Sequence, residues 1–155
     1  MYIQTKCFYF VFIMKASGSR FSKCLYFSAN AFARKVEKLA ADSWKKINLT
    51  PSHAYLLMTV IEEPGVQPGK LADEMQLTPS TITRLIEKME AHKLVVRTTE
   101  GKVTNVYPTP KANQLYPQMK NCRDEFYTSC ISFLGVEESK RMAQNINKLN
   151  DKLSR

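Results

Sequence analysis

The sequence predicts a mainly α-helical fold with one small β-hairpin. Apolar residues recur at spacings of three and four along most of the chain, which is the period of an amphipathic helix. Two helix starts carry the same signal, a threonine followed by a proline, at Thr50-Pro51 and Thr78-Pro79. A single pair of β-branched runs, separated by Glu100-Gly101, predicts the hairpin. At 155 residues, the chain is long enough for one domain with a sizeable core.

Three helices are predicted before residue 76. Residues 22–46 contain neither Pro nor Gly, and their apolar positions predict one long helix. A second helix over residues 54–62 ends at Pro64-Gly65, and residues 68–75 predict a short third helix. The turn at Gln76-Leu77 leads into a fourth. The second to fourth helices therefore form a helix-turn-helix arrangement.

The fourth helix, over residues 78–90, has one apolar face and one polar face. Thr78 can accept a hydrogen bond from the first turn, and Pro79 lacks a donor that would go unused there. The stripe predicted to be buried is Ile82, Leu85, Ile86 and Met89. The polar face carries small hydroxyls and cations, namely Ser80, Thr81, Thr83, Arg84 and Lys88. Such side chains let a helix approach base edges and phosphates closely, although an ordinary surface helix also fits this pattern.

A hairpin and two helices follow. β-branched residues predict strands over 94–99 and 102–107, joined by a turn at Glu100-Gly101. A fifth helix is predicted over residues 111–134, and Gly135 separates it from a sixth. The sixth has an apolar stripe of Met142, Ile146, Leu149 and Leu153. We expect this stripe to be buried against a second copy of the chain or against the first helix.

The formal net charge of +9 is unevenly placed. Most of the excess of Lys and Arg over acidic residues lies in residues 1–50, before the helix-turn-helix. The charge therefore favours a polyanionic partner only weakly, because a solvated basic first helix explains it equally well.

The sequence predicts no metal ion, catalytic residue or cofactor. Its four cysteines form no CxxC pair and lie far from both histidines in sequence, which argues against zinc. Paired carboxylates, a nucleophile elbow and a phosphate-binding loop are lacking, so we do not expect an enzyme. The apolar residues 7–14 are too few to span a bilayer, and a poor cleavage region follows them. We therefore expect a cytoplasmic protein without membrane contact, and Met14 is a candidate for its natural start.

Four segments match a known pattern in the same order. They are residues 49–57 (LTPSHAYLL), 70–75 (KLADEM), 80–95 (STITRLIEKMEAHKLV) and 109–112 (TPKA), and the third is the most specific. Together they resemble the MarR family of bacterial winged-helix transcription factors, over about residues 22–153. Ala112 stands where a glycine is usual in the family. The resemblance implies a winged helix-turn-helix, whose wing is the β-hairpin, with dimerisation helices at both ends of the chain.

The resemblance further implies a homodimer that binds double-stranded DNA and regulates transcription, as a ligand-responsive repressor. After an N-terminal extension of residues 1–21, residues 22–48 would form the first dimerisation helix. Residues 49–110 would bind DNA, and residues 111–155 would form the C-terminal dimerisation helices. Two-fold symmetry would place the two copies of the fourth helix in successive major grooves of a near-palindromic operator, about 34 Å apart.

Nine residues are candidates for DNA contact: Lys70, Pro79, Ser80, Thr81, Thr83, Arg84, Lys88, Arg97 and Lys102. Arg84 can donate two parallel hydrogen bonds to guanine O6 and N7. Its alternatives are a phosphate contact or an ion pair with Glu87 or Glu90. Because the wing is shorter than is usual in the family, we expect Arg97 and Lys102 to bind flanking phosphates rather than the minor groove. Lys70 binds phosphate in the same way or is solvated.

The resemblance also implies a small aromatic effector in a cleft between the dimerisation helices and the DNA-binding region. Phe27, Arg34, His53 and Tyr55 are the candidate lining residues. The alternative is structural, because aromatic residues at helical spacing are more often core, and a histidine at a helix start is more often satisfied within the fold.

Two further functions stay open. One branch of the family senses organic hydroperoxides with a cysteine near the start of the first helix, and Cys24 lies close to that position but out of register. A buried, inert thiol is the alternative for Cys24. The other function is a protein-interaction module, in which the winged helix serves only to dimerise.

Overall fold

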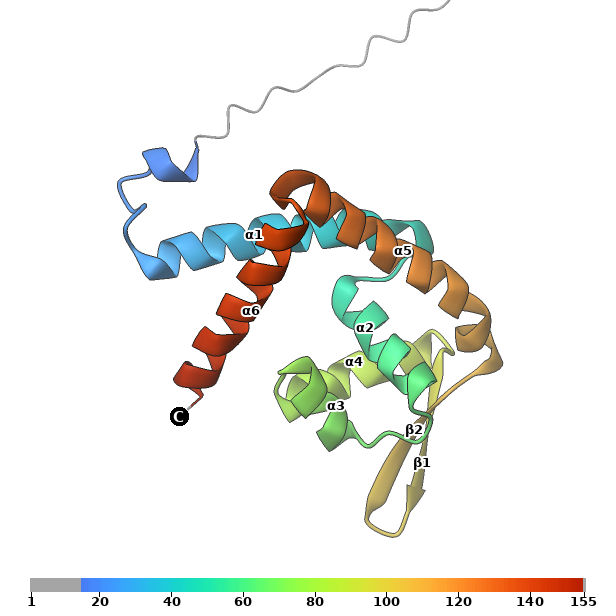
Figure 1. Cartoon of the computed structure of the whole chain (residues 1–155). Helices are drawn as coiled ribbons and strands as arrows, with labels where there is room; N and C mark the ends of the chain where they lie inside the picture. Colours follow the sequence, from blue (N-terminus) through green and yellow to red (C-terminus); the bar gives the residue numbers. More distant parts are fainter. Residues whose placement is uncertain (1–14, 155) are drawn as a thin grey trace, which may run out of the picture. The chain divides into compact units, whose positions relative to one another are not determined.

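The computed structural model describes residues 15–154 (Figure 1). These residues divide into two units. The first unit runs to Val36 and the second begins at Glu37, so the boundary lies within α1, Leu25–Trp44. Over the described residues the chain is mainly helical and contains one two-stranded antiparallel sheet. The predicted fold class is confirmed.

The first unit contains a short 3-10 helix, Ala16–Gly18, and the N-terminal part of α1. None of its described side chains is buried. Helix α1 begins at Leu25 rather than at residue 22, because residues 20–23 form a turn in which the Cys24 amide donates to the carbonyl of Phe21. It also ends early, at Trp44, where a 3-10 helix over Lys45–Ile47 takes over. Asn48, in the left-handed conformation with φ of +55°, then stops the helix.

In the second unit, α2 (Pro51–Glu62), α3 (Pro68–Met75) and α4 (Pro79–Ala91) pack against one another (Figure 1). Helix α2 begins at Pro51 rather than at residue 54, because proline holds the φ angle that the first helical position needs. The Thr50 side chain does not cap this helix. Thr78 does cap α4 as predicted, since its hydroxyl accepts from the Thr81 amide at 3.3 Å.

The core of the second unit orients α4. Ile82, Ile86 and Met89 are fully buried and Leu85 is half-buried, so the predicted stripe is confirmed. They pack in one cluster with Trp44 and with residues of α2 such as Leu56, Leu57 and Val60. Burying a large aliphatic side chain stabilises a fold by about 1.5–3 kcal/mol. This stripe therefore fixes which face of α4 remains exposed.

The hairpin pairs β1 (Val95–Glu100) with β2 (Val103–Pro108), with Arg97 opposite Val106. Both strands lie one residue later than predicted, so the turn is Gly101-Lys102 rather than Glu100-Gly101. Gly101 has a φ of +62°, a conformation that glycine adopts without steric cost. At the base, Val106 is fully buried and also bridges to Val66 in the loop after α2. The hairpin is thereby tied to the helix-turn-helix.

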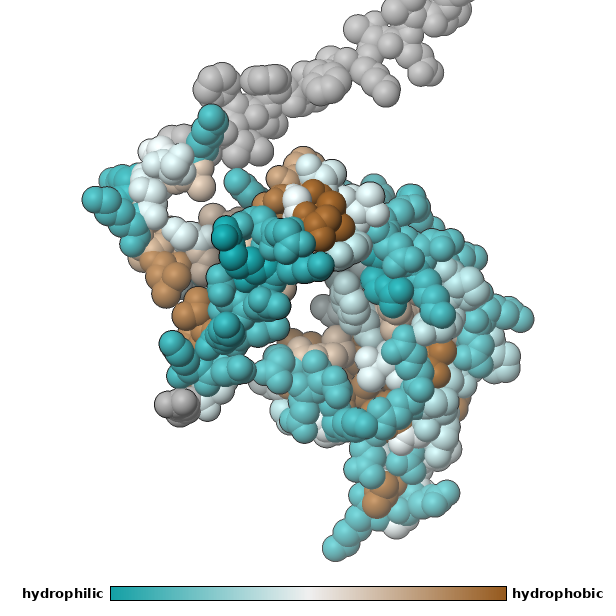
Figure 2. Space-filling model, viewed as in Figure 1, coloured by the Kyte–Doolittle hydropathy of each residue, from teal (hydrophilic) through white to brown (hydrophobic). Residues whose placement is uncertain are grey.

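The chain continues with α5 (Pro110–Leu134) and α6 (Val136–Leu153). Pro110 opens α5, one residue before the predicted start, and the Thr109 hydroxyl caps the helix by accepting from the Ala112 amide at 3.3 Å. No residue of α6 is buried, and Leu149 is 54% exposed and Leu153 82% exposed. Figure 2 shows apolar side chains gathered where α5 meets α6, a region in which Phe133 is 77% exposed. The apolar stripe of α6 is thus largely uncovered in the single chain.

Candidate nucleic-acid interface

The polar face of α4 is open to solvent along its length. Ser80, Thr81, Thr83, Arg84 and Lys88 are all exposed. The Thr78 hydroxyl lies 3.1 Å from the hydroxyl of Ser80 and 2.9 Å from that of Thr81. The Thr83 hydroxyl donates to the carbonyl of Pro79 at 3.0 Å. These bonds order the hydroxyls of the first turn, and the oxygens of Ser80, Thr81 and Thr83 each keep a lone pair for a further donor.

Arg84 forms no ion pair within residues 15–154. The pair with Glu87 or Glu90, considered from the sequence, is not formed, because Glu90 binds Arg97 instead. The guanidinium of Arg84 therefore presents its five N–H donors outward from the middle of α4. A planar donor fork on an exposed helix face is suited to the edge of a guanine or to a phosphate.

Two other candidate cations are bound to acidic residues of the same chain. Lys70 on α3 forms an ion pair with Glu63, whose hydrogen bond raises the pKa of Lys70 above its ordinary value. Arg97 on β1 pairs with Glu90 in the last turn of α4. The Arg97 Nε–H donates to Oε1 at 3.0 Å and Nη2 donates to Oε2 at 2.5 Å. Neither cation is simply solvated.

The remaining candidates differ in their surroundings. Lys102 is exposed in the turn at the tip of the hairpin. Lys88 lines a pocket of about 470 Å³, together with Lys45, His92 and residues 48–50, which precede α2. Pro79 is the first residue of α4, where it sets the start of the helix. Lys88 and Lys102 form no ion pair among the described residues.

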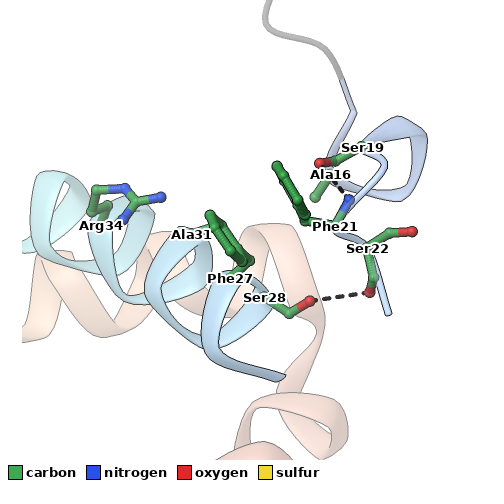
Figure 3. A pocket seen from close by; sticks show the side chains of 8 residues that line it. All are labelled: Ala16, Ser19, Phe21, Ser22, Phe27, Ser28, Ala31 and Arg34. Carbon is green, nitrogen blue, oxygen red and sulfur yellow. Dashed lines mark hydrogen bonds between the residues drawn. The ribbon is translucent and has the colours of Figure 1, made fainter. Parts of the chain in front are cut away.

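Two of the four candidate effector residues share a pocket in the first unit (Figure 3). Phe27 stacks on Phe21, with ring centroids 4.4 Å apart, and Arg34 lies farther along α1 at the rim. The pocket measures about 150 Å³ and is otherwise lined by alanines and serines. Cys24, immediately before α1, is exposed rather than buried.

His53 and Tyr55 lie on α2, in the second unit. His53 is buried, and its Nδ1 lies 2.6 Å from the Thr50 hydroxyl. Burial lowers the pKa of His53, and the positive charges of Lys88 and His92 lower it further. Tyr55 is half exposed, and its ring meets that of Trp44 edge-on at 5.6 Å.

The structure adds two residues that the sequence interpretation did not assign to this region. Glu90 was considered only as a partner of Arg84, yet it connects α4 to the wing through Arg97. Lys111 donates to the carbonyl of His92 at 3.0 Å, at the C-terminal end of α4. The sequence feature that could have predicted the role of Glu90 is its charge, which is opposite to that of Arg97, the two residues being separated only by the short link from α4 to β1.

Over the part of the chain that the structure describes, no helix is long and apolar enough to cross a membrane. Within those same residues, no three His, Cys, Asp or Glu side chains gather closely enough to hold a metal ion.

Comparison with known proteins shows the fold and matches the helix-turn-helix region to a family. Residues 47–103, which include α2, α3, α4 and β1, match the model of the MarR family. The HTH-type transcriptional repressor MdtR of Bacillus subtilis (strain 168) is 22% identical over 136 residues, covering 86% of this chain and 88% of MdtR. The S. aureus MepR–DNA complex superposes with a TM-score of 0.71 at 19% identity, covering 83% of this chain and 97% of that chain. The repressor CouR bound to p-coumaroyl-CoA superposes with a TM-score of 0.76 at 15% identity, covering 86% and 96%. Residues 47–103 are thus similar to the MarR family, and the chain has the winged-helix fold of the transcriptional regulators MepR and CouR.

Proposed function

We propose that the protein is a homodimeric repressor that binds a near-palindromic operator and releases it when a small effector binds. One observation carries the DNA-reading part of this proposal. The exposed face of α4 presents ordered hydroxyls and an arginine that has no ion-pair partner within the described chain. In a helix-turn-helix protein, this is the face that enters the major groove.

The candidate contacts divide into base contacts and backbone contacts. Ser80, Thr81, Thr83 and Arg84 lie toward the N-terminal half of α4, the part of such a helix that reaches base edges. We assign Arg84 to a guanine and the hydroxyls to bases or phosphates. The backbone contacts are Lys70, Lys88, Arg97 and Lys102, with Pro79 setting the start of α4.

The dimer is supported by apolar surface that one chain leaves in water. Ile146, Leu149 and Leu153 are exposed on α6, and Phe133 and Leu134 are exposed at the end of α5. Burial of apolar surface is favourable by about 25 cal/mol per Å², so association with a second copy of the chain through this surface would be favourable. We assign residues 22–48 and 111–155 to dimerisation and residues 49–110 to DNA binding, after the extension of residues 1–21.

The repressor and effector roles are supported by relatives. MdtR is named a repressor, and CouR is a repressor whose structure contains p-coumaroyl-CoA, an aromatic compound. In this chain, Phe27 and Arg34 line a pocket that offers an aromatic face and a cation. We propose that an aromatic anion binds in this pocket. We also propose that His53 and Tyr55 on α2 belong to the region that responds to binding of this effector.

Selection from a library of random-sequence duplexes tests the proposal. The parent protein should enrich sites with two inverted half-sites whose centres are about one helical turn apart, roughly 34 Å. Enrichment of a single half-site would contradict the two-fold geometry. The absence of any enrichment would contradict sequence-specific binding and would favour the protein-interaction module.

A further inference from the structure

The contact between Glu90 and Arg97 joins the two parts of the DNA-binding region. Glu90 lies in the last turn of α4, and Arg97 lies on β1 with its side chain on the same face as the buried Val95. The two side chains are only 28% and 33% exposed. Together they make the one ion pair of the described chain that links α4 to the wing.

The geometry of the pair leaves part of Arg97 unused. The Glu90 carboxylate accepts hydrogen bonds from one side of the guanidinium, from Nε at 3.0 Å and from Nη2 at 2.5 Å. A guanidinium has five N–H donors, so the two on Nη1 and one on Nη2 remain. These three lie at the end of the side chain and form a second fork, which matches two oxygens of a phosphate.

We propose that Glu90 is a positioning residue for DNA binding: it holds Arg97 from the side so that the end of the guanidinium grips a backbone phosphate. This inference rests on the proposed function, in which the wing contacts DNA. Arginine loses considerable rotamer freedom when it is immobilised, and the ion pair removes that freedom before DNA arrives. An acidic residue would thereby strengthen binding to a polyanion.

The direction in which one substitution changes DNA affinity separates this role from simple electrostatic repulsion. Removing a negative charge near DNA should tighten binding, whereas releasing Arg97 should weaken it. We expect Glu90→Gln to weaken binding about two- to tenfold per subunit, which corresponds to the ordering cost of one long side chain. Glu87→Gln is the matched control, because Glu87 is exposed on the same helix and forms no ion pair among the described residues. It should tighten binding by less than about threefold.

The experiment titrates the full-length protein and its variants against a duplex selected with the parent protein. In the Arg97→Ala background, Glu90→Gln should instead tighten DNA binding. Without Arg97, the only effect of the substitution is to remove the repulsion between the Glu90 carboxylate and the DNA phosphates. A merely structural role of Glu90 would weaken binding in both backgrounds and would overturn the proposal. Thermal unfolding of each variant checks that the fold is kept.

The experiment distinguishes failure of the positioning role of Glu90 from failure of the proposed function. If the parent binds its selected duplex and Glu90→Gln tightens binding as Glu87→Gln does, only the positioning role is wrong. If the parent binds no duplex at all, the proposed function is wrong and this inference fails with it.

Discussion

In the proposed function, Arg84 is the side chain that contributes most to recognition of the DNA sequence. It lies on the exposed face of α4 without an ion-pair partner in the described chain, so Arg84→Ala removes donors without disturbing the buried stripe. We expect the change to cost about 1–3 kcal/mol of binding free energy per subunit and to relax specificity at one position of each half-site. Titration against the selected duplex and a scrambled duplex measures both effects.

Lys102→Ala is the control for Arg84→Ala, because Lys102 is exposed at the tip of the wing. It should weaken binding to both duplexes about equally and lower the salt slope by about one per subunit, as loss of a phosphate contact requires. Equal losses on both duplexes for Arg84→Ala would instead assign Arg84 to the backbone.

His53 should make stability depend on pH. Burial lowers its pKa in the folded state, so the unfolded chain binds more protons as the solution is acidified. The stability from neutral His53 is therefore present above the ordinary histidine pKa of about 6.5 and is lost as the pH falls toward the lower folded value. In urea titrations between pH 7.5 and 5.5, His53→Asn should lose less stability on acidification than the parent. Parallel pH profiles would contradict this assignment.

Cys24 should not act as a peroxide switch. It is exposed just before α1, and the sequence predicts that it lies out of register with the sensing position. We expect mild peroxide treatment to leave DNA binding by the parent unchanged, with Cys24→Ser as the comparison. If the parent releases DNA after oxidation and Cys24→Ser does not, the redox function is the correct one.

The sequence could predict which side chains α4 exposes, because its helical period and its cap are local. It could not predict how Arg97 and Lys70 are used, because their partners are set by tertiary packing. Arg97 meets Glu90 only when β1 folds back beside the last turn of α4, and Lys70 meets Glu63 across the loop between α2 and α3. The exposure of Arg84 on α4 was therefore predictable, and the ion pair of Arg97 with Glu90 was not.

Among the elements, α4 should depend on its first turn. The Thr78 hydroxyl accepts from the Thr81 amide and contacts the hydroxyls of Ser80 and Thr81. We expect Thr78→Ala to lower the free energy of unfolding by about 0.5–2 kcal/mol, whereas Thr78→Ser should retain most of the cap. Urea unfolding of the three proteins compares them, and equal stability of Thr78→Ala and the parent would show that the cap contributes nothing.

Helix types were predictable and several of their ends were not. A threonine–proline pair marks α2, α4 and α5, and all three helices begin at the proline. The proline ring holds the helical φ, so the predicted starts of α2 and α5 were too late. The turn of the hairpin was misplaced by one residue because Gly101 is its first residue rather than its last. A left-handed conformation at Gly101 fits both placements, and strand pairing decides between them.

At the scale of the whole molecule, the exposed apolar stripe of α6 should hold two chains together. Replacing Leu149 and Leu153 with Glu would place charges where we expect a dry interface, while disturbing no buried residue of the single chain. The double variant should shift toward monomer at micromolar concentration and lose affinity for the selected duplex. Asn145→Glu, on an exposed polar position of the same helix, should leave both properties unchanged.

The central claim is a dimer that presents two copies of α4 to one operator. Sedimentation equilibrium of the parent protein, alone and with the selected duplex, measures this most directly. We predict a mass of two chains for the protein at micromolar concentration and of two chains on one duplex for the complex. A folded monomer that binds the duplex as a single chain would contradict the claim.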